Sequence, residues 1–372
     1  MKIAIFGGSF NPVHNEHVKV ALGALEELKL DKLIIMPTFI SPHKQNAEVI
    51  SANHRLNMLK IAFRRFDKVE ISDYEIEKGG VSYTYQTVEH YKNLYSGADL
   101  YFMVGSDMLE DFPTWKNPQS ICDNATLLLT ERRNGEFDNQ KLIKKVEELY
   151  NAKIERLNVY GENLSSTKIR TYKKLGLSLD GLVPNEVEEY IEKNEVYSSN
   201  KYYDYIKNNL PEKRLIHTAG VIITALNLAK KLGVDLKKAE LSALLHDVAK
   251  YKNPSDYKNF TLPGNMPKDV EHQFLGAYIA KEELNVQDED VLSAIKYHTT
   301  GRSGMTMLEK VIYIADLIEP SRRFIGVESL REEINKDFNK GFKVCLEEIV
   351  EFLIKSGKEV YSLTQDALKG EL

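Results

Sequence analysis

The feature that most constrains the fold is a change of sequence pattern near residue 200. Before it, short apolar runs typical of buried strands alternate with segments of helical periodicity. After it, the strand-like runs end and helical segments follow one another. Alternating strands and helices pack as a parallel sheet covered on both faces, whereas consecutive helices pack as a bundle. We therefore expect an α/β domain over residues 1–199 and an all-α domain over residues 200–372.

The expected elements are short strands in the first part and helices in both. The strands are Lys2–Phe6, Leu33–Pro37, Leu100–Val104 and Ala125–Leu129, with helices at Val18–Lys29, His54–Arg65 and Tyr85–Leu94. Glycine and proline stop signals separate the helices of the second part, which are Tyr202–Asn208, Arg214–Leu232, Lys238–Tyr251, His272–Glu283, Glu289–His298, Thr306–Ile318 and Val327–Ser356.

Composition excludes several classes of protein. The chain has 50 Lys and Arg against 55 Asp and Glu, which argues against a dedicated nucleic-acid binder. We expect no membrane-spanning helix, and the apolar start is too short for a signal peptide. Cys122 and Cys345 are the chain's two cysteines, so a disulfide framework or a cysteine-based zinc site is excluded. We expect a cytoplasmic enzyme that binds neither nucleic acid nor membrane.

The first expected strand runs directly into the sequence GGSFNPVHNEH at residues 7–17. A glycine-rich turn between a strand and a helix is typical of phosphate binding, because free amide groups at the helix start attract an anion. The turn has neither dinucleotide-fold nor P-loop spacing. His14 and His17 share one helix face, where they can bind a triphosphate; a chance pairing of two histidines is the alternative at this point.

Later segments decide between a triphosphate site and a chance pairing of histidines. They are Pro37–Lys44, Asn53–Leu59, Ser82–Thr84, Val104–Met108 with Trp115, and Leu164–Arg170. Together with His14-x-x-His17 they resemble bacterial nicotinate-nucleotide adenylyltransferases of the nucleotidyltransferase superfamily, over residues 1–199. The resemblance implies a Rossmann-like fold and transfer of AMP from ATP, with Mg²⁺, to nicotinate mononucleotide, releasing pyrophosphate.

The resemblance also assigns roles to residues. It implies that His14, His17 and Lys44 are catalytic, and that nicotinate mononucleotide binds at Thr84, Trp115 and Arg133. It implies an ATP site made of Gly7, Gly8, Ser9, Phe10, His14, His17, Gly105, Asp107, Ser166, Thr167 and Arg170.

The chain departs from this family's pattern at three positions. Asn11 stands where the family usually has aspartate, Glu16 where it has glycine, and Asn134 where it has proline. Glu16 adds a negative charge near the expected phosphate site. An impaired transferase domain that serves as a nucleotide-binding or regulatory module is therefore an alternative.

In the second part, the pair His246-Asp247 ends a strongly apolar helical run. Burying an unpaired polar pair there is costly, so these side chains need a strong partner such as a metal ion. Imidazole and carboxylate ligands without thiolates suit iron, manganese or other first-row ions.

The order His217, His246-Asp247, Asp316 resembles the HD phosphohydrolase superfamily, and His272 and His298 between them imply a second metal. The flanking sequences over residues 202–366 resemble the bacterial YqeK family, which contains symmetrical diadenosine tetraphosphate hydrolases with a di-iron centre. The resemblance implies six metal ligands, His217, His246, Asp247, His272, His298 and Asp316, and two divalent ions, iron or manganese. Asp247 is the implied bridge between the ions, Lys250 a phosphate contact, and Arg302 and Arg322 polyphosphate clamps.

The resemblances together predict a bifunctional enzyme. Its substrates are ATP, nicotinate mononucleotide and diadenosine tetraphosphate. Other nucleotide substrates on the same folds are the second alternative. The expected helix around Phe338–Phe352 packs internally or forms a homodimer contact, and the sequence does not decide between these.

Overall fold

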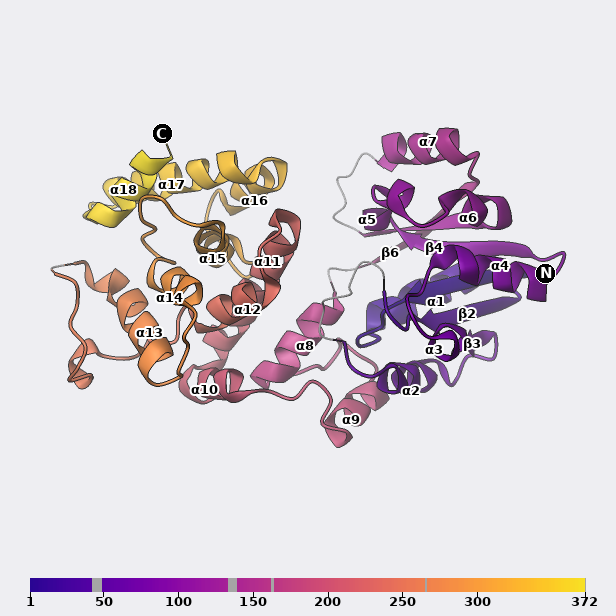
Figure 1. Ribbon diagram of the computed structural model, residues 1–372, viewed down its shortest axis with the longest axis horizontal. Coiled ribbons are helices and arrows are strands. Elements are labelled where there is room, and N and C mark those ends of the chain that lie inside the picture. Colours follow the sequence, from indigo (N-terminus) through magenta and orange to yellow (C-terminus); the bar gives the residue numbers. More distant parts are fainter. Residues whose placement is uncertain (42–48, 133–138, 162–163, 265, 372) are drawn as a thin grey trace. The chain divides into compact units, whose positions relative to one another are not determined.

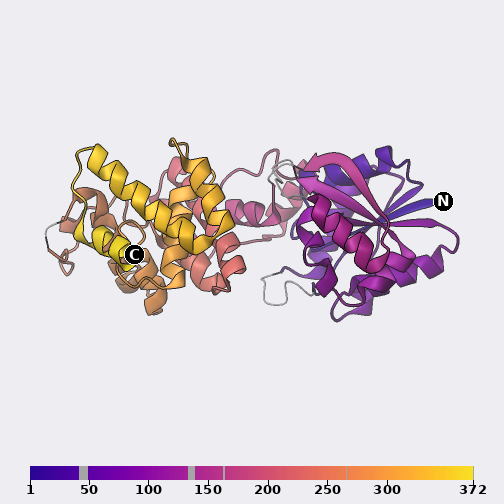
Figure 2. The same cartoon turned by 90° about the horizontal axis from the view of Figure 1, so that it is seen from above.

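The computed structural model describes residues 1–41, 49–132, 139–161, 164–264 and 266–371. The chain forms two compact units (Figures 1 and 2). Unit 1 comprises Met1–Arg170 and Leu179–Tyr197, and unit 2 comprises Thr171–Ser178 and Ser198–Leu372. The units are interleaved in the sequence, because helix α8 (Ser166–Leu175) begins in unit 1 and ends in unit 2.

Unit 1 is built on a parallel six-stranded sheet, which confirms the predicted fold class. The strand order is β3-β2-β1-β4-β5-β6, with β1 (Lys2–Gly8), β2 (Lys32–Pro37), β3 (Val69–Ile71), β4 (Asp99–Gly105), β5 (Thr126–Arg132) and β6 (Ile154–Gly161). The four predicted strands correspond to β1, β2, β4 and β5, whereas β3 and β6 were not predicted. The order of connection reverses between β1 and β4, and ligands of such sheets bind at this switch point.

Helices pack side by side around this sheet (Figure 1). Contacts join α4 to α6 and α6 to α7, while α2 contacts α9. Helix α1 lies very close to β6: a Cβ on Gly23 would be 2.2 Å from Val159 Cγ2. The helices of this unit are α1 (Asn15–Glu27), α2 (Ala52–Phe63), α3 (Tyr74–Lys78), α4 (Thr84–Leu94), α5 (Ser106–Leu109), α6 (Pro118–Asn124), α7 (Asn139–Tyr150) and α9 (Asn185–Lys193), with a 3₁₀ turn at Phe112–Thr114.

Unit 2 is helical, as predicted. Its α-helices are α10 (Lys201–Asn209), α11 (Glu212–Leu232), α12 (Leu236–Leu245), α13 (Glu271–Glu282), α14 (Glu289–Lys296), α15 (Met307–Ile318), α16 (Val327–Lys336), α17 (Phe338–Lys355) and α18 (Ser362–Gly370). Short 3₁₀ turns lie at Pro254–Asp256 and Lys268–Val270.

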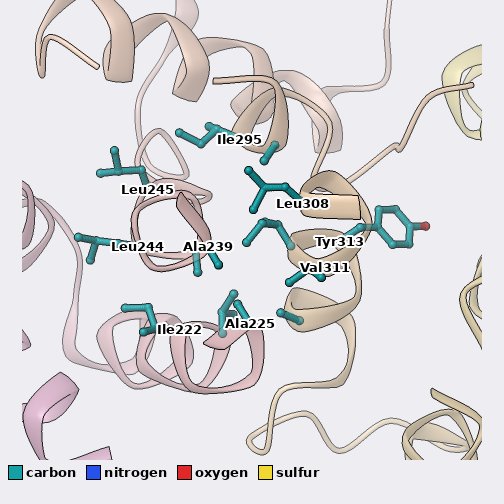
Figure 3. Close-up of a cluster of buried hydrophobic side chains, with 14 of the residues drawn as sticks. Ile222, Ala225, Ala239, Leu244, Leu245, Ile295, Leu308, Val311 and Tyr313 are labelled. Carbon is teal, nitrogen blue, oxygen red and sulfur yellow. The ribbon is translucent and has the colours of Figure 1, made fainter. Parts of the chain in front are cut away.

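The core of unit 2 lies between α11, α12, α14 and α15. Figure 3 shows Ile222 of α11, Leu244 of α12, Ile295 of α14 and Val311 of α15, which belong to one cluster of buried apolar side chains. The end of α8 belongs to this core as well: Leu175 is fully buried within it.

Two predicted helices differ from the structure. The segment predicted as Lys238–Tyr251 is helical only to Leu245, and His246 caps it. The segment predicted as Val327–Ser356 divides at Asp337, which is extended and accepts a hydrogen bond from the Lys340 amide at the start of α17. An aspartate that caps a helix start in this way ends the helix before it. Helix α18 was not predicted.

One helix in the described part of the chain, α11, is long and apolar enough to cross a membrane by length and composition. Half of its apolar window is buried inside the fold. The core helix of a helical bundle has the same composition, and α11 contributes to the core of unit 2.

Candidate functional sites

The loop between β1 and α1 is held by two arginines that are distant in sequence. Arg55 of α2 is 1% exposed, and its Nη1 donates to the Ser9 carbonyl at 2.9 Å. Arg170 of α8 donates from Nη1 to the Asn11 carbonyl at 2.8 Å. These contacts fix the loop backbone at the carboxyl end of β1, where a nucleotide is expected.

The side chain of Asn11 is also engaged. It is buried, and its Oδ1 accepts a hydrogen bond from the Tyr197 hydroxyl at 2.8 Å. Burial raises the pKa of Tyr197, so this phenol is a neutral donor. Ser166 Oγ donates to the Pro12 carbonyl at 2.9 Å. Asn11 therefore contributes to the loop's internal structure, while Glu16 has one carboxylate oxygen, Oε1, buried without a hydrogen-bond partner among the described residues.

His14 and His17 cap helix α1 reciprocally. The His17 amide donates to His14 Nδ1 at 3.3 Å, and the His14 amide donates to His17 Nδ1 at 3.2 Å. The two rings stack with centroids 3.5 Å apart. Because both Nδ1 atoms accept hydrogen bonds, each neutral ring carries its proton on Nε2. An Nε2–H group at the positive end of a helix dipole suits a phosphate.

The other residues predicted for unit 1 surround the same edge of the sheet or lie outside the described residues. Gly8 passes close to the Phe10 ring, since a Cβ there would be 3.1 Å away. Thr167 Oγ1 accepts from Arg170 Nη2 at 3.2 Å. Gly7 is the next-to-last residue of β1, Gly105 ends β4 and Thr84 begins α4. Lys44, Arg133 and Asn134 lie outside the described residues, as does the side chain of Asp107.

Trp115 packs inside unit 1 against two phenylalanines. Its ring meets Phe102 edge-on at 6.4 Å and Phe112 at 5.2 Å between centroids. The indole is half-buried, so part of its surface faces outward. Its predicted stacking on a pyridine ring stays a prediction.

In unit 2, the six predicted metal ligands come from five helical segments. His217 lies in α11, His272 in α13 and Asp316 in α15. The remaining three follow helix ends: His246 and Asp247 after α12, and His298 after α14. Helix ends and helix faces thus bring together side chains that are up to about a hundred residues apart.

Asp247 lies at the centre of this cluster. Its Oδ2 is 3.8 Å from His217 Nε2 and 3.5 Å from His246 Nε2. Its Oδ1 is 3.3 Å from His272 Nε2 and 3.7 Å from His298 Nε2. Asp247 therefore belongs to two buried groups of potential metal ligands, one through each oxygen.

The chemistry of the cluster fits divalent metal ions. Oδ1 of Asp247 is buried without a hydrogen bond among the described residues, although four imidazoles surround the carboxylate. Burial lowers the pKa of His246, and it lowers the pKa of His272 to about 4. Both rings are therefore neutral at neutral pH, as a metal ligand must be. Nitrogen and carboxylate donors without sulfur suit first-row ions.

The carboxylates of the cluster favour positive charge beside them. Burial alone would raise the pKa of Asp247, but the neighbouring His246 and His272 outweigh it and lower the pKa. Burial alone would lower the pKa of His217, yet hydrogen bonds to Asp316 and Glu319 raise it. His217 Nε2 lies 3.1 Å from Asp316 Oδ1. A metal ion bound between these groups supplies the charge that they favour.

Three cations border the cluster. Lys250 Nζ is 3.1 Å from His272 Nε2 and 3.5 Å from Asp247 Oδ1. Arg214 donates to Asp247 Oδ2 at 2.7 Å, and Arg322 donates to Asp316. These positions are suited to binding phosphate oxygens of a substrate at the metals.

Arg302 has a different environment. Its guanidinium makes two hydrogen bonds, of 2.9 and 3.0 Å, to the fully buried carboxylate of Glu309. It also lies over the Tyr297 ring. The structure therefore gives Arg302 a structural partner, and its predicted role as a polyphosphate clamp stays a prediction.

Four residues that shape these sites were not predicted from the sequence: Arg55, Tyr197, Arg214 and Glu319. Arg55 and Arg214 lie within the motifs used for the resemblances, but nothing near them in the sequence signals their contacts. Tyr197 and Glu319 contact residues 186 and 102 positions away. An alternating or helical pattern does not reveal pairings at such distances.

Comparisons with known proteins match the two parts of the chain to two different families. Residues 5–172 match the cytidylyltransferase-like family and residues 214–321 match the HD domain family. A protein of Mycoplasma genitalium, described as a probable nicotinate-nucleotide adenylyltransferase/Ap4A hydrolase, is 31% identical over 87% of this chain and 88% of its own length. The chain belongs to the nicotinate-nucleotide adenylyltransferase/Ap4A hydrolase family.

Single-domain relatives match each half of this family member. A probable nicotinate-nucleotide adenylyltransferase of Clostridium tetani is 42% identical over 53% of this chain and 98% of its own length. The symmetrical bis(5'-nucleosyl)-tetraphosphatase of Bacillus subtilis is 43% identical over 42% of this chain and 88% of its own length. The predicted family is therefore confirmed for both halves of the chain.

Proposed function

We propose that this chain is a bifunctional enzyme that forms nicotinate adenine dinucleotide in unit 1 and cleaves diadenosine tetraphosphate symmetrically in unit 2. The observation that carries the proposal is the pair of ligand groups that share Asp247, in a chain whose fused relative is described by both activities. Nucleotides are the substrates of both reactions.

In unit 1, the phosphate oxygen of nicotinate mononucleotide attacks the α-phosphorus of ATP. The new P–O bond forms as the bond from the α-phosphorus to the bridging oxygen breaks, and pyrophosphate leaves. Mg²⁺ bound with ATP supplies charge neutralisation. The chain contributes the Nε2–H groups of His14 and His17 and the start of α1, which stabilise charge on the phosphates without a covalent intermediate.

The remaining unit 1 residues bind and orient the substrates in this proposal. Ser166, Thr167 and Arg170 border the polyphosphate at the start of α8, with Lys44 nearby. Gly105 and Asp107 face the ribose, and Thr84, Trp115 and Arg133 hold the nicotinate nucleotide.

In unit 2, we assign two divalent ions, iron or manganese, to the two groups around Asp247, with Asp316 completing the first group. Bound ions supply Lewis acidity and an activated water molecule. Water adds to a phosphorus of the central anhydride and the bridging P–O bond breaks, so that two ADP molecules leave. Lys250, Arg214 and Arg322 hold the phosphate oxygens during this step.

The test is one incubation of the full chain, purified without oxygen and loaded with Fe²⁺ or Mn²⁺. Diadenosine tetraphosphate is added and the nucleotides are separated by chromatography, beside an Asp247→Ala control. ADP as the sole product, lost in the control, supports the proposal. ATP with AMP contradicts symmetrical cleavage, and no turnover with either metal contradicts the hydrolase assignment.

The transferase activity is tested separately with ATP, Mg²⁺ and nicotinate mononucleotide. Formation of nicotinate adenine dinucleotide that is lost in His17→Ala supports the assignment. The alternative of an impaired domain predicts little product from the parent and a gain in Asn11→Asp/Glu16→Gly. Asn11 is buried, and one carboxylate oxygen of Glu16 is buried without a hydrogen-bond partner among the described residues, which motivates this double change. A cytoplasmic location, a homodimer and a lack of nucleic-acid binding remain predictions.

A further inference from the structure

The four histidines of the metal cluster are held in two different ways. His246 Nδ1 bonds the Ala243 carbonyl at 2.7 Å, and His298 Nδ1 bonds the Ile295 carbonyl at 2.8 Å. Both carbonyls lie in the last turn of a helix, where backbone oxygens have no partner within the helix. A local backbone acceptor thus fixes these two rings with the proton on Nδ1 and the Nε2 lone pair toward Asp247.

Among the described residues, the partners of the His217 ring nitrogens are side chains instead of a local backbone carbonyl. This histidine lies in the second turn of α11, where the carbonyls before it accept helical hydrogen bonds. Its Nδ1 instead faces Glu319 Oε1 at 3.0 Å, and its Nε2 faces Asp316 at 3.1 Å. A carboxylate only accepts hydrogen bonds, so Glu319 requires the proton on Nδ1.

Glu319 is itself held rigidly. It is fully buried and follows α15 directly, three residues after Asp316. The Ser321 amide donates to its Oε2 at 2.6 Å, and the Ser321 hydroxyl donates to its Oε1. Arg331 fixes the backbone by donating to the Glu319 carbonyl at 2.7 Å.

A glycine in α11 makes room for this carboxylate. Gly220 lies one turn after His217, and a Cβ there would be 2.3 Å from Glu319 Oε2 and 3.1 Å from its carboxyl carbon. Glycine costs about 1 kcal/mol relative to alanine in a helix. At this position the absence of a Cβ leaves the space that the Glu319 carboxylate occupies.

We propose that Glu319 is a positioning residue that sets the tautomer and orientation of His217 for metal binding, with Gly220 providing the space. The inference rests on the metal centre of the proposed function. Without Glu319, either nitrogen of His217 can carry the proton. A proton on Nε2 would donate to Asp316 and occupy the lone pair that a metal needs. Carboxylates behind metal-ligating histidines typically change metal affinity 10- to 100-fold when they are removed.

Glu319→Gln tests this without changing the size of the side chain. Both oxygens of Glu319 accept hydrogen bonds, one from His217 and one from the Ser321 amide. Glutamine has a single acceptor oxygen. If that oxygen accepts the hydrogen bond from the Ser321 amide, the NH₂ group of the glutamine faces His217. That arrangement favours the proton on Nε2, the wrong tautomer for a ligand.

The measurement is binding of Mn²⁺ alone to the metal-free full chain, followed by the paramagnetic resonance signal of free Mn²⁺. Glu319→Gln and Gly220→Ala are each expected to weaken the affinity of a Mn²⁺ site by about 10- to 100-fold. Gly220→Ala changes no acid and no ligand, and it decides the question if Glu319→Gln does not fold. Glu309→Gln is the matched control, because Glu309 is an equally buried acid on α15 that binds Arg302 and Thr306 instead.

The outcomes separate this inference from the proposed function. Equal Mn²⁺ affinity of Glu319→Gln and the parent overturns the inference alone. Equal weakening in Glu309→Gln also overturns it, since the effect would then come from a less stable α15. A parent that binds no Mn²⁺ overturns both the metal centre and the inference.

Discussion

Leu175 provides a sharp test of how the chain divides into units. It ends α8, a helix that starts at the expected ATP site, yet its side chain is fully buried in the core of unit 2. Its neighbour Lys174 binds Glu240 of α12 at 3.2 Å and lies over the Tyr203 ring of α10. Leu175→Ala should therefore destabilise the helical unit, although the sequence pattern assigned this residue to the α/β domain.

The magnitude follows from the burial. Replacing a fully buried leucine by alanine costs about 2–5 kcal/mol, because apolar contact is lost and a cavity remains. We expect about 3 kcal/mol, within this range, for Leu175. A loss of 3 kcal/mol speeds exchange through global opening by roughly 10²-fold.

Hydrogen exchange followed by mass spectrometry locates the effect, because peptides report each unit separately. Peptides of α11 and α12 should exchange faster in Leu175→Ala, and peptides of β1 and β4 should not. Leu33→Ala, at a fully buried position near the start of β2, is the control that should produce the opposite pattern. Faster exchange in the strands of Leu175→Ala, with unchanged helices, would refute the assignment of residues 171–178 to unit 2.

Three further predictions concern packing and charge. Gly23→Ala should cost about 1–3 kcal/mol of stability in thermal unfolding, because the new methyl overlaps Val159; an unchanged midpoint would contradict the close packing. Burial raises the pKa of Glu75 despite a hydrogen bond from Thr87, so its contribution to stability is present below pH 4.5 and lost as pH rises through the folded pKa. The unfolding midpoint of Glu75→Gln should therefore rise relative to that of the parent between pH 4.5 and 7. Parallel pH profiles of the two midpoints would contradict this. Arg302→Met should cost about 2–3 kcal/mol without raising KM for diadenosine tetraphosphate, since Arg302 pairs with Glu309 and is itself partly exposed. A raised KM at unchanged stability would instead favour the clamp.

Strands and helices were predictable from the sequence where the local apolar pattern is strong, and they were missed where this pattern is weak. β1, β2, β4 and β5 are buried apolar runs, and they were expected. β3 has three half-buried residues, and β6 lies at the edge of the sheet and mixes charged with apolar residues, so neither stands out. Helical periodicity runs across Asp337, and the break there depends on one capping side chain.

The predicted metal ligands lie close together in the structure, and their order in the sequence was enough to identify them. Their supporting residues were not predictable in the same way. Glu319 acts across 102 positions and Arg55 across 46, and each depends on how helices pack. Local patterns encode which side chains are apolar, whereas the tertiary fold decides which polar side chains meet.

The sharing of Asp247 between the two ligand groups has a consequence for how such a centre changes over generations. In the proposed two-ion centre, a substitution of Asp247 would remove a ligand from both ion positions at once. A substitution of His298 or His217 would remove a ligand from one position and leave the other group unchanged. We therefore expect stepwise evolutionary change of this centre at the outer histidines rather than at the shared carboxylate.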